Sequence, residues 1–415
     1  MPASKRPRRV QRIVAIVLAV ALVAGGLIAD QTGLGRKGGS YGDSEAYAYL
    51  YDSMECLSYG WLRWTFYLWG THFTDENSAS GRYRRACVRV AEEEFDQAAE
   101  WMSACIDQGQ MADRSDAESA ALYMQLACIQ SLAGNALDAA EAARHAATLE
   151  PGQAQTQQMC YQFCLEANDS LGAAEALANY TELTSDTTRY EEIADLYLQA
   201  GEYEESGRFY DLAIEINGED QRLFYLRGTC RMLQGQYREA IEDFSSSDVP
   251  GSLYSRGICE MALSDFDAAE ASFEASIERG QQTGDSQMML AVCRLEKGEY
   301  EQALSLFDEY LQSGGDYEQI AYYRGMARMM LEDYQGAIED FDASAAAGNS
   351  VQECIFAAAQ CRYFTGAYQE AAEQFEKCVE AQFNTAQSQY YLGLSLAALG
   401  RSEEAEEALR QALGE

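Results

Sequence analysis

The segment GMARMMLEDYQGAIEDF, residues 325–341, carries the pattern that decides the fold of this 415-residue chain. A small residue opens the segment and Ala-Arg follows two residues later. After a turn comes an aromatic residue, with Ala three residues further on and Phe four residues after that. The same frame recurs with small variations at 228–244, 257–273, 291–307 and 358–375. A frame that recurs at a nearly fixed spacing predicts stacked structural units, each of which buries its core against its neighbours.

Extending this frame along the chain gives repeats that start near residues 79, 120, 154, 187, 221, 250, 284, 318, 352 and 386. Frame position 8 is small in nine of the ten repeats, and position 20 is small in all ten. Small residues there let two helices approach closely, and large side chains then fill the remaining space. The large residues include a Phe at position 24 of five consecutive repeats: Phe244, Phe273, Phe307, Phe341 and Phe375. Only four prolines interrupt the chain, which also favours an all-α fold.

A 34-residue period with this pattern resembles the tetratricopeptide repeat (TPR), and the resemblance covers residues 79–415. It implies an all-α, right-handed superhelical solenoid of about ten helical hairpins. The family usually has Pro at position 32, where this chain has only Pro151. The fifth repeat is shortened to 29 residues and ends at Pro250. We expect this short link to kink the superhelix or to divide it into arms at 79–249 and 250–415.

The N-terminus has the pattern of a membrane anchor. A basic cluster at residues 5–12 precedes an apolar run at 13–29, which would span ~25 Å as a helix. By the positive-inside rule, residues 1–30 are predicted to be a cytoplasmic tail and transmembrane helix, with the repeats outside the cytoplasm. Cleavage as a signal peptide, giving a secreted protein, is the alternative. The five glycines of residues 31–44 predict a tether.

Residues 45–78 are one period long but do not fit the frame, because Trp64 stands where a small residue is needed. We expect an aromatic-rich helical hairpin that turns at Tyr59-Gly60. It would be either a cap on the open end of the solenoid or an aromatic belt near a membrane. The aromatic set is Tyr59, Trp61, Trp64, Phe66, Tyr67, Trp69 and Phe73.

Composition and motifs exclude several classes of protein. The chain has 67 acidic and 30 basic residues, a net charge of -37 that repels nucleic acid. It lacks a Gly-rich phosphate loop and the metalloprotease and hydrolase motifs. Its two histidines are not part of any recognisable group of catalytic residues. The acid pairs Glu242-Asp243 and Glu339-Asp340 recur at fixed frame positions, which predicts a solvated helix face. We therefore expect no enzyme activity and no cofactor.

Cysteine and arginine also follow the frame. Most of the twelve cysteines occupy small core positions, as Cys230 and Cys293 do at position 10, so they are interpreted as packing residues. Cys160 and Cys164 lie one helical turn apart but lack further ligands, so no metal site is expected. Four arginines occupy position 11. They would pair with acids of neighbouring helices or, alternatively, face an acidic ligand. They are Arg231, Arg294, Arg328 and Arg362.

The resemblance implies a concave groove lined by the first helix of each hairpin. In repeats 5 to 10 the lining positions are apolar, aromatic and Met-rich, which suits an adaptable peptide groove. Superhelical curvature or a contact between arms could instead cover them. The predicted groove residues are Tyr225, Met232, Tyr254, Met261, Met288, Leu295, Tyr322, Met326, Met329, Phe356, Tyr363 and Tyr390. In repeats 3 and 4 the same positions are polar, with Gln155, Gln158, Gln162, Glu166, Glu191 and Asp195.

The sequence thus predicts a non-catalytic scaffold that binds a protein or peptide, displayed on the extracytoplasmic side of a membrane. A ligand with one basic and one apolar segment would suit both halves of the groove. Two alternatives remain: a structural component that self-associates as a homo-oligomer, and an accessory subunit of an envelope-assembly or secretion complex.

Overall fold

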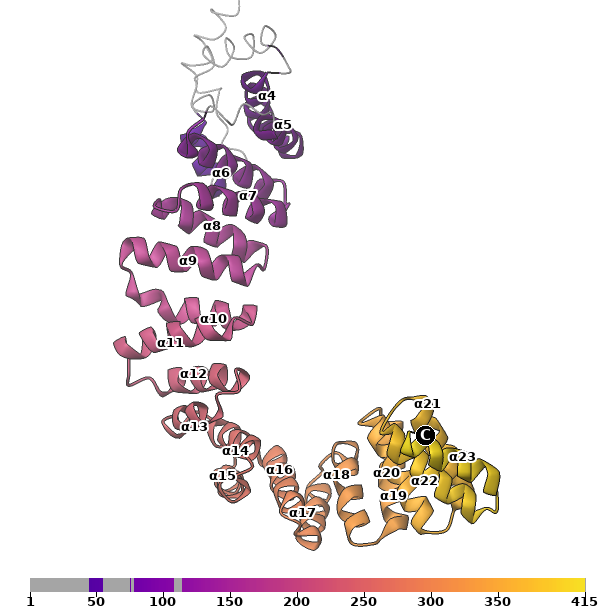
Figure 1. Ribbon diagram of the computed structural model, residues 1–415. Helices are drawn as coiled ribbons and strands as arrows, with labels where there is room; N and C mark the ends of the chain where they lie inside the picture. Colours follow the sequence, from indigo (N-terminus) through magenta and orange to yellow (C-terminus); the bar gives the residue numbers. More distant parts are fainter. Residues whose placement is uncertain (1–44, 55–74, 76–77, 108–113, 415) are drawn as a thin grey trace, which may run out of the picture. The chain divides into compact units, whose positions relative to one another are not determined.

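The computed structural model describes residues 45–54, 75, 78–107 and 114–414. All regular secondary structure in these ranges is helical. Helices α4 to α23 pair as ten successive helix–turn–helix hairpins in the described chain, and within each unit consecutive helices lie side by side (Figure 1). The chain divides into two compact units, unit 1 up to Ile216 and unit 2 from Asn217 onward.

Unit 1 contains α2 and four hairpins, the last of which is preceded by a short 3₁₀ helix. Its elements are α2 (Glu45–Ser53), α4 (Ala79–Ala91), α5 (Phe95–Asp107), α6 (Asp116–Leu132), α7 (Ala136–Leu149), α8 (Ala154–Glu166), α9 (Ser170–Thr184), η3 (Thr187–Arg189), α10 (Tyr190–Ala200) and α11 (Tyr203–Ile216). One apolar cluster runs from Ala46 on α2 to Tyr197 on α10.

Unit 2 contains six hairpins. Their helices are α12 (Gln221–Leu233), α13 (Tyr237–Ser245), α14 (Ser252–Ala262), α15 (Phe266–Glu278), α16 (Thr283–Glu296), α17 (Tyr300–Gln312), α18 (Tyr317–Met330), α19 (Tyr334–Ala346), α20 (Val351–Phe364), α21 (Tyr368–Glu380), α22 (Thr385–Ala398) and α23 (Ser402–Leu413).

The core of unit 2 repeats one packing arrangement. The Phe residues at frame position 24 have at most 1% of their surface exposed. Each lies against the small residue at position 8 of the same hairpin. A Cβ added to Gly257 would lie 2.6 Å from the Phe273 ring, and one added to Gly325 would lie 2.9 Å from the Phe341 ring. Both approaches are too close for an unadjusted methyl group, so the backbone of the first helix packs directly on the ring.

The hairpin turns place one residue in the left-handed backbone region. In most repeats of unit 2 this residue is Gly, as at Gly298, where φ is 79°. Ser264 and Glu332 occupy the same frame position with φ values of 60° and 64°. Since a side chain is disfavoured in this conformation, these two turns carry local strain.

The division between units does not fall at the short link before Pro250, where the sequence suggested one. It falls at Ile216/Asn217. Helices α13 and α14 pack on each other across the short link, and Phe244 shares an apolar cluster with Cys259. The shortened repeat therefore keeps its core continuous with the next one.

The predicted single-pass membrane arrangement, with the repeats outside the cytoplasm, needs correction. Within the described ranges, none of the helices combines the length and the hydropathy needed to cross a bilayer. The apolar run 13–29 and the tether 31–44, like most of the predicted hairpin at 45–78, lie outside the described residues.

Candidate functional site

The predicted groove residues lie on the first helices of unit 2, and we call the residues at frame positions 5, 9, 12 and 13 of these helices the first-helix face. In four of the six hairpins, an aromatic side chain at position 5 packs on the position-24 Phe of its own hairpin. The ring centroids of Tyr225 and Phe244 are 5.7 Å apart, and those of Tyr322 and Phe341 are 6.2 Å apart. These aromatic residues therefore support the core as well as forming a surface.

Burial divides the twelve predicted groove residues into three groups. Ten of them are half-buried. Tyr390 is 49% exposed, whereas Phe356 is only 8% exposed. Phe356 packs among the rings of Phe375, Phe383 and Tyr391 and belongs to the core. The other residues offer an apolar surface of partly accessible side chains.

Three apolar residues of this face that are at least as accessible as Tyr390 were missing from the predicted set. Leu233 and Met330 are each 49% exposed and Phe364 is 52% exposed, all at frame position 13. Phe364 stacks on Tyr334 at 5.2 Å, and its edge meets Tyr363 at 5.5 Å. We call Met330, Tyr334, Tyr363 and Phe364 the Phe364 patch. Position 13 is Ala or Glu in the other repeats of unit 2, so no periodic signal marks it in the sequence.

Acidic residues lie near the first-helix face. Burial is the main cause of the raised pKa of Tyr254, and the charge of Asp285 adds to it. Burial also raises the pKa of Tyr322, with smaller contributions from Cys354 and then Glu353. Glu332 and Asp333 are exposed in the turn that follows Met330. An apolar surface with acidic neighbours favours a ligand that is apolar and basic.

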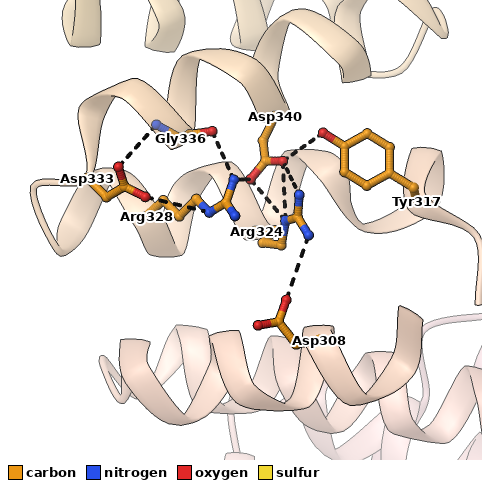
Figure 2. A network of polar contacts seen from close by, with 7 residues as sticks. All are labelled: Asp308, Tyr317, Arg324, Arg328, Asp333, Gly336 and Asp340. Atoms are coloured by element: carbon orange, nitrogen blue, oxygen red, sulfur yellow. Dashed lines mark hydrogen bonds and ion pairs between the residues drawn. The ribbon is translucent and has the colours of Figure 1, made fainter. Parts of the chain in front are cut away.

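Beneath this face, unit 2 contains buried ion clusters. Asp340 has no exposed surface. It accepts hydrogen bonds from Arg324 Nη2 at 2.6 Å, from Arg328 Nη1 at 2.9 Å and from the Tyr317 hydroxyl at 2.7 Å (Figure 2). Burial acts to lower the pKa of Arg324, but the hydrogen bond and charge of Asp340 outweigh it and raise the pKa. The cluster joins α18 to α19 within one hairpin.

The hairpin of α12 and α13 repeats this arrangement. Asp243 is 2% exposed and accepts hydrogen bonds from Arg227 Nη2 at 2.5 Å and from Arg231 Nη1 at 2.8 Å. Asp243 and Asp340 share frame position 23, so the prediction that both acids of each recurring pair are solvated is wrong. The first acid of each pair, Glu242 or Glu339, is exposed. The second is buried because two arginines one helical turn apart neutralise it.

The position-11 arginines are paired with acids, as one of the two interpretations predicted. Besides Arg231 and Arg328, Arg294 bonds Glu270 at 3.1 Å and Arg362 bonds Asp342 at 2.5 Å. In the repeat that starts at 250, position 11 is Glu260 instead. Glu260 accepts a hydrogen bond from the Ser272 hydroxyl and lies 3.4 Å from Arg256. These side chains serve the packing of hairpins, so a ladder of arginines facing a ligand is not formed.

The cysteines form a set of buried thiols. The eleven that lie in the described ranges are free and buried, which confirms their interpretation as packing residues. Burial raises the pKa of Cys259 and Cys378 to about 11 and that of Cys293 and Cys361 to about 12. Cys160 and Cys164 have their sulfurs 4.0 Å apart. Among the described residues, no group of three or more His, Cys, Asp or Glu could hold a metal ion.

The fold and its repeated core define a helical-hairpin repeat protein. Family models of the tetratricopeptide repeat match residues 188–220, 254–318 and 356–415. The chain therefore carries tetratricopeptide repeats in both units. The handedness of a superhelix built from them stays a prediction. A search of curated proteins found no match.

Solved structures of other repeat proteins resemble this chain. The crystal structure of YrrB, a TPR protein with an unusual peptide-binding site, is 21% identical, covers 44% of this chain and 97% of its own, and has a TM-score of 0.37. Naa15/Naa10 bound to HypK-THB is 14% identical over 80% of this chain and 63% of its own, with a TM-score of 0.38. The P58(IPK) TPR domain is 16% identical over 78% of this chain and 99% of its own, with a TM-score of 0.29.

Proposed function

We propose that the protein is a non-catalytic scaffold that binds a polypeptide partner on the first-helix face of unit 2. The observation that carries the proposal is the exposure of the Phe364 patch, where Met330 and Phe364 keep about half of their surface accessible. Clustered apolar side chains of this kind are characteristic of surfaces that bind a partner.

The chemistry of the face defines the kind of partner. Methionine and aromatic side chains adapt to apolar ligands of different shape, which suits an aliphatic or aromatic anchor residue. The exposed carboxylate of Glu332, close to Met330 in the sequence, favours basic residues beside that anchor. We therefore expect a peptide segment that carries an apolar anchor with Lys or Arg next to it.

The test compares the full-length chain with two variants in affinity capture. Met330→Glu/Phe364→Glu places charge on the patch, and Leu413→Glu makes the same kind of change at a residue that is 76% exposed on α23. Circular dichroism checks that both variants keep their helices. We expect proteins captured by the parent and by Leu413→Glu to be lost from the double variant.

The proposal fails if the double variant captures the same proteins as the parent. Sedimentation of the full-length chain at several concentrations tests whether the chain self-associates through this face. Larger species that form in the parent and disappear in the double variant would mean that the partner is a second copy of this chain.

A further inference from the structure

Helix α2 packs on α6, the first helix of the second hairpin of unit 1. Ala46, Leu50 and Met54 follow one another every four residues, so they face the same side, and Leu50 and Met54 have no exposed surface. They belong to one apolar cluster with Met124 and Cys128 of α6, against which α2 packs. Met124 and Cys128 occupy frame positions 5 and 9, the positions of the predicted groove in unit 2. On α6 the chain itself covers these positions.

Between α2 and α8 this packing leaves a cavity of about 570 Å³. From α2, Tyr49, Asp52 and Ser53 line it. From α8 come Met159 and three glutamines at frame positions 2, 5 and 9: Gln155, Gln158 and Gln162. These glutamines are three and four residues apart, so they follow one side of the helix and present their carboxamides in a row.

The electrostatics of this cavity favour a cation. Asp52 carries a negative charge into the lining, and none of the described lining residues is Lys, Arg or His. Helix α2 ends beside Asp52 with no basic residue in its last turn, so the partial negative charge of its C-terminus is not offset there.

Two further groups of the lining suit a planar cation with several N–H donors. The Ser53 Oγ atom is buried and has no hydrogen-bond partner among the described residues. Burial raises the pKa of Tyr49 to about 12, so its ring stays neutral and offers a π-face. Three carboxamide oxygens, one carboxylate and one hydroxyl are enough acceptors for a guanidinium, which has five N–H donors in a fixed plane.

We propose that the cavity between α2 and α8 binds a guanidinium group, presented as an Arg side chain by a partner polypeptide. The site belongs to unit 1 and is separate from the first-helix face of unit 2. Because α2 forms one wall, the packing of Leu50 and Met54 on α6 positions the carboxylate of Asp52 for the ligand.

The experiment uses isothermal titration of the full-length chain at physiological salt with three probes. They are acetyl-Gly-Gly-Arg-Gly-Gly-amide, the same peptide with citrulline in place of Arg, and N-acetylarginine amide. We expect the Arg peptide to bind, and the neutral citrulline peptide to bind at least tenfold more weakly. If N-acetylarginine amide binds as tightly as the Arg peptide, the site exists but its ligand is a free guanidinium compound. If it binds more weakly than the Arg peptide, the ligand is an Arg residue of a polypeptide.

Two charge variants show whether binding is local. Asp52→Asn should weaken binding of the Arg peptide about tenfold, whereas Asp138→Asn, which removes one exposed carboxylate on α7, should change it less than twofold. Gln158→Leu should also weaken binding while circular dichroism stays unchanged. The proposal is overturned if the Arg peptide does not bind the parent, if citrulline binds equally well, or if the two Asp variants have the same effect.

Discussion

Arg324 donates to both carboxylate oxygens of Asp340, with Nη2 2.6 Å from Oδ1 and Nε 3.0 Å from Oδ2. Because Asp340 is fully buried, its charge depends on this contact and on Arg328 for compensation. Removing one partner of a buried ion pair leaves the other charge without water or a counter-ion. The pair therefore makes the closure of the α18–α19 hairpin sensitive to a single substitution.

We expect Asp340→Asn to lower the free energy of unfolding by about 3 kcal/mol, because two arginines then lose their counter-charge in a buried position. Urea unfolding of the full-length chain, followed by circular dichroism, measures the change. Asp308→Asn is the control, since Asp308 is 61% exposed and lies 3.8 Å from Arg324. A loss for Asp340→Asn no larger than that for the control would contradict the structural role of the cluster.

A second prediction concerns the pH dependence at Glu260. Burial is the main cause of its raised pKa, and hydrogen bonding to Ser272 and the charge of Arg256 oppose this. A carboxyl group with a raised folded-state pKa stabilises the fold in its protonated form, and this contribution is lost as the pH rises through that pKa. We expect Glu260→Gln to raise the thermal midpoint at pH 7 and to have little effect near pH 4. An equal shift at both pH values would contradict the prediction.

Relief of backbone strain gives a third prediction. Glu332 has a φ of 64° in the turn between α18 and α19. Replacing it with Gly should stabilise the protein by about 0.5–1 kcal/mol, since Gly adopts this conformation without a steric penalty. The reciprocal change Gly298→Ala, at the same frame position, should destabilise by a similar amount. Denaturant midpoints measure the stability changes of both variants. A loss of stability in Glu332→Gly would contradict the claim that the backbone is strained at this residue.

The contact of Gly257 with Phe273 gives a fourth prediction. Because a Cβ at residue 257 would lie 2.6 Å from the ring, we expect Gly257→Ala to cost about 1–3 kcal/mol. Phe273→Leu alone should also destabilise, since the ring is fully buried. The double variant should lose less stability than the sum of the two single losses, because the smaller Leu side chain makes room for the methyl group. Strict additivity would mean that the two residues do not constrain each other.

The hairpins could be predicted from the sequence because their core depends on residues at fixed frame positions. Position 8 is small and position 24 is Phe for one physical reason, the direct packing of a backbone on a ring. That reason acts within one hairpin, and the repetition makes it visible. The pairing of Arg231 and Arg328 was also open to prediction, since each has an aspartate twelve residues later in the sequence.

Other features depend on contacts that a repeat frame does not encode. The burial of Asp243 and Asp340 needs a second arginine at position 7, Arg227 or Arg324, which only two hairpins combine with an acid at position 23. Phe356 became a core residue because Phe375 and Phe383 of its own repeat and Tyr391 of the next repeat surround its ring. Helix α2 lies outside the repeat frame, whereas α6 lies inside it. The periodicity of the sequence therefore carries no information about the packing of these two helices.

The buried thiols give the chain its own reporters of local opening. Cysteine reacts with alkylating reagents as an exposed thiolate, and the described thiols are buried in both units. Each will be labelled only when the helix that carries it detaches from its neighbours. Labelling rates read by peptide mass spectrometry would therefore rank segments of the unmodified protein by their free energy of opening, with no engineered probe.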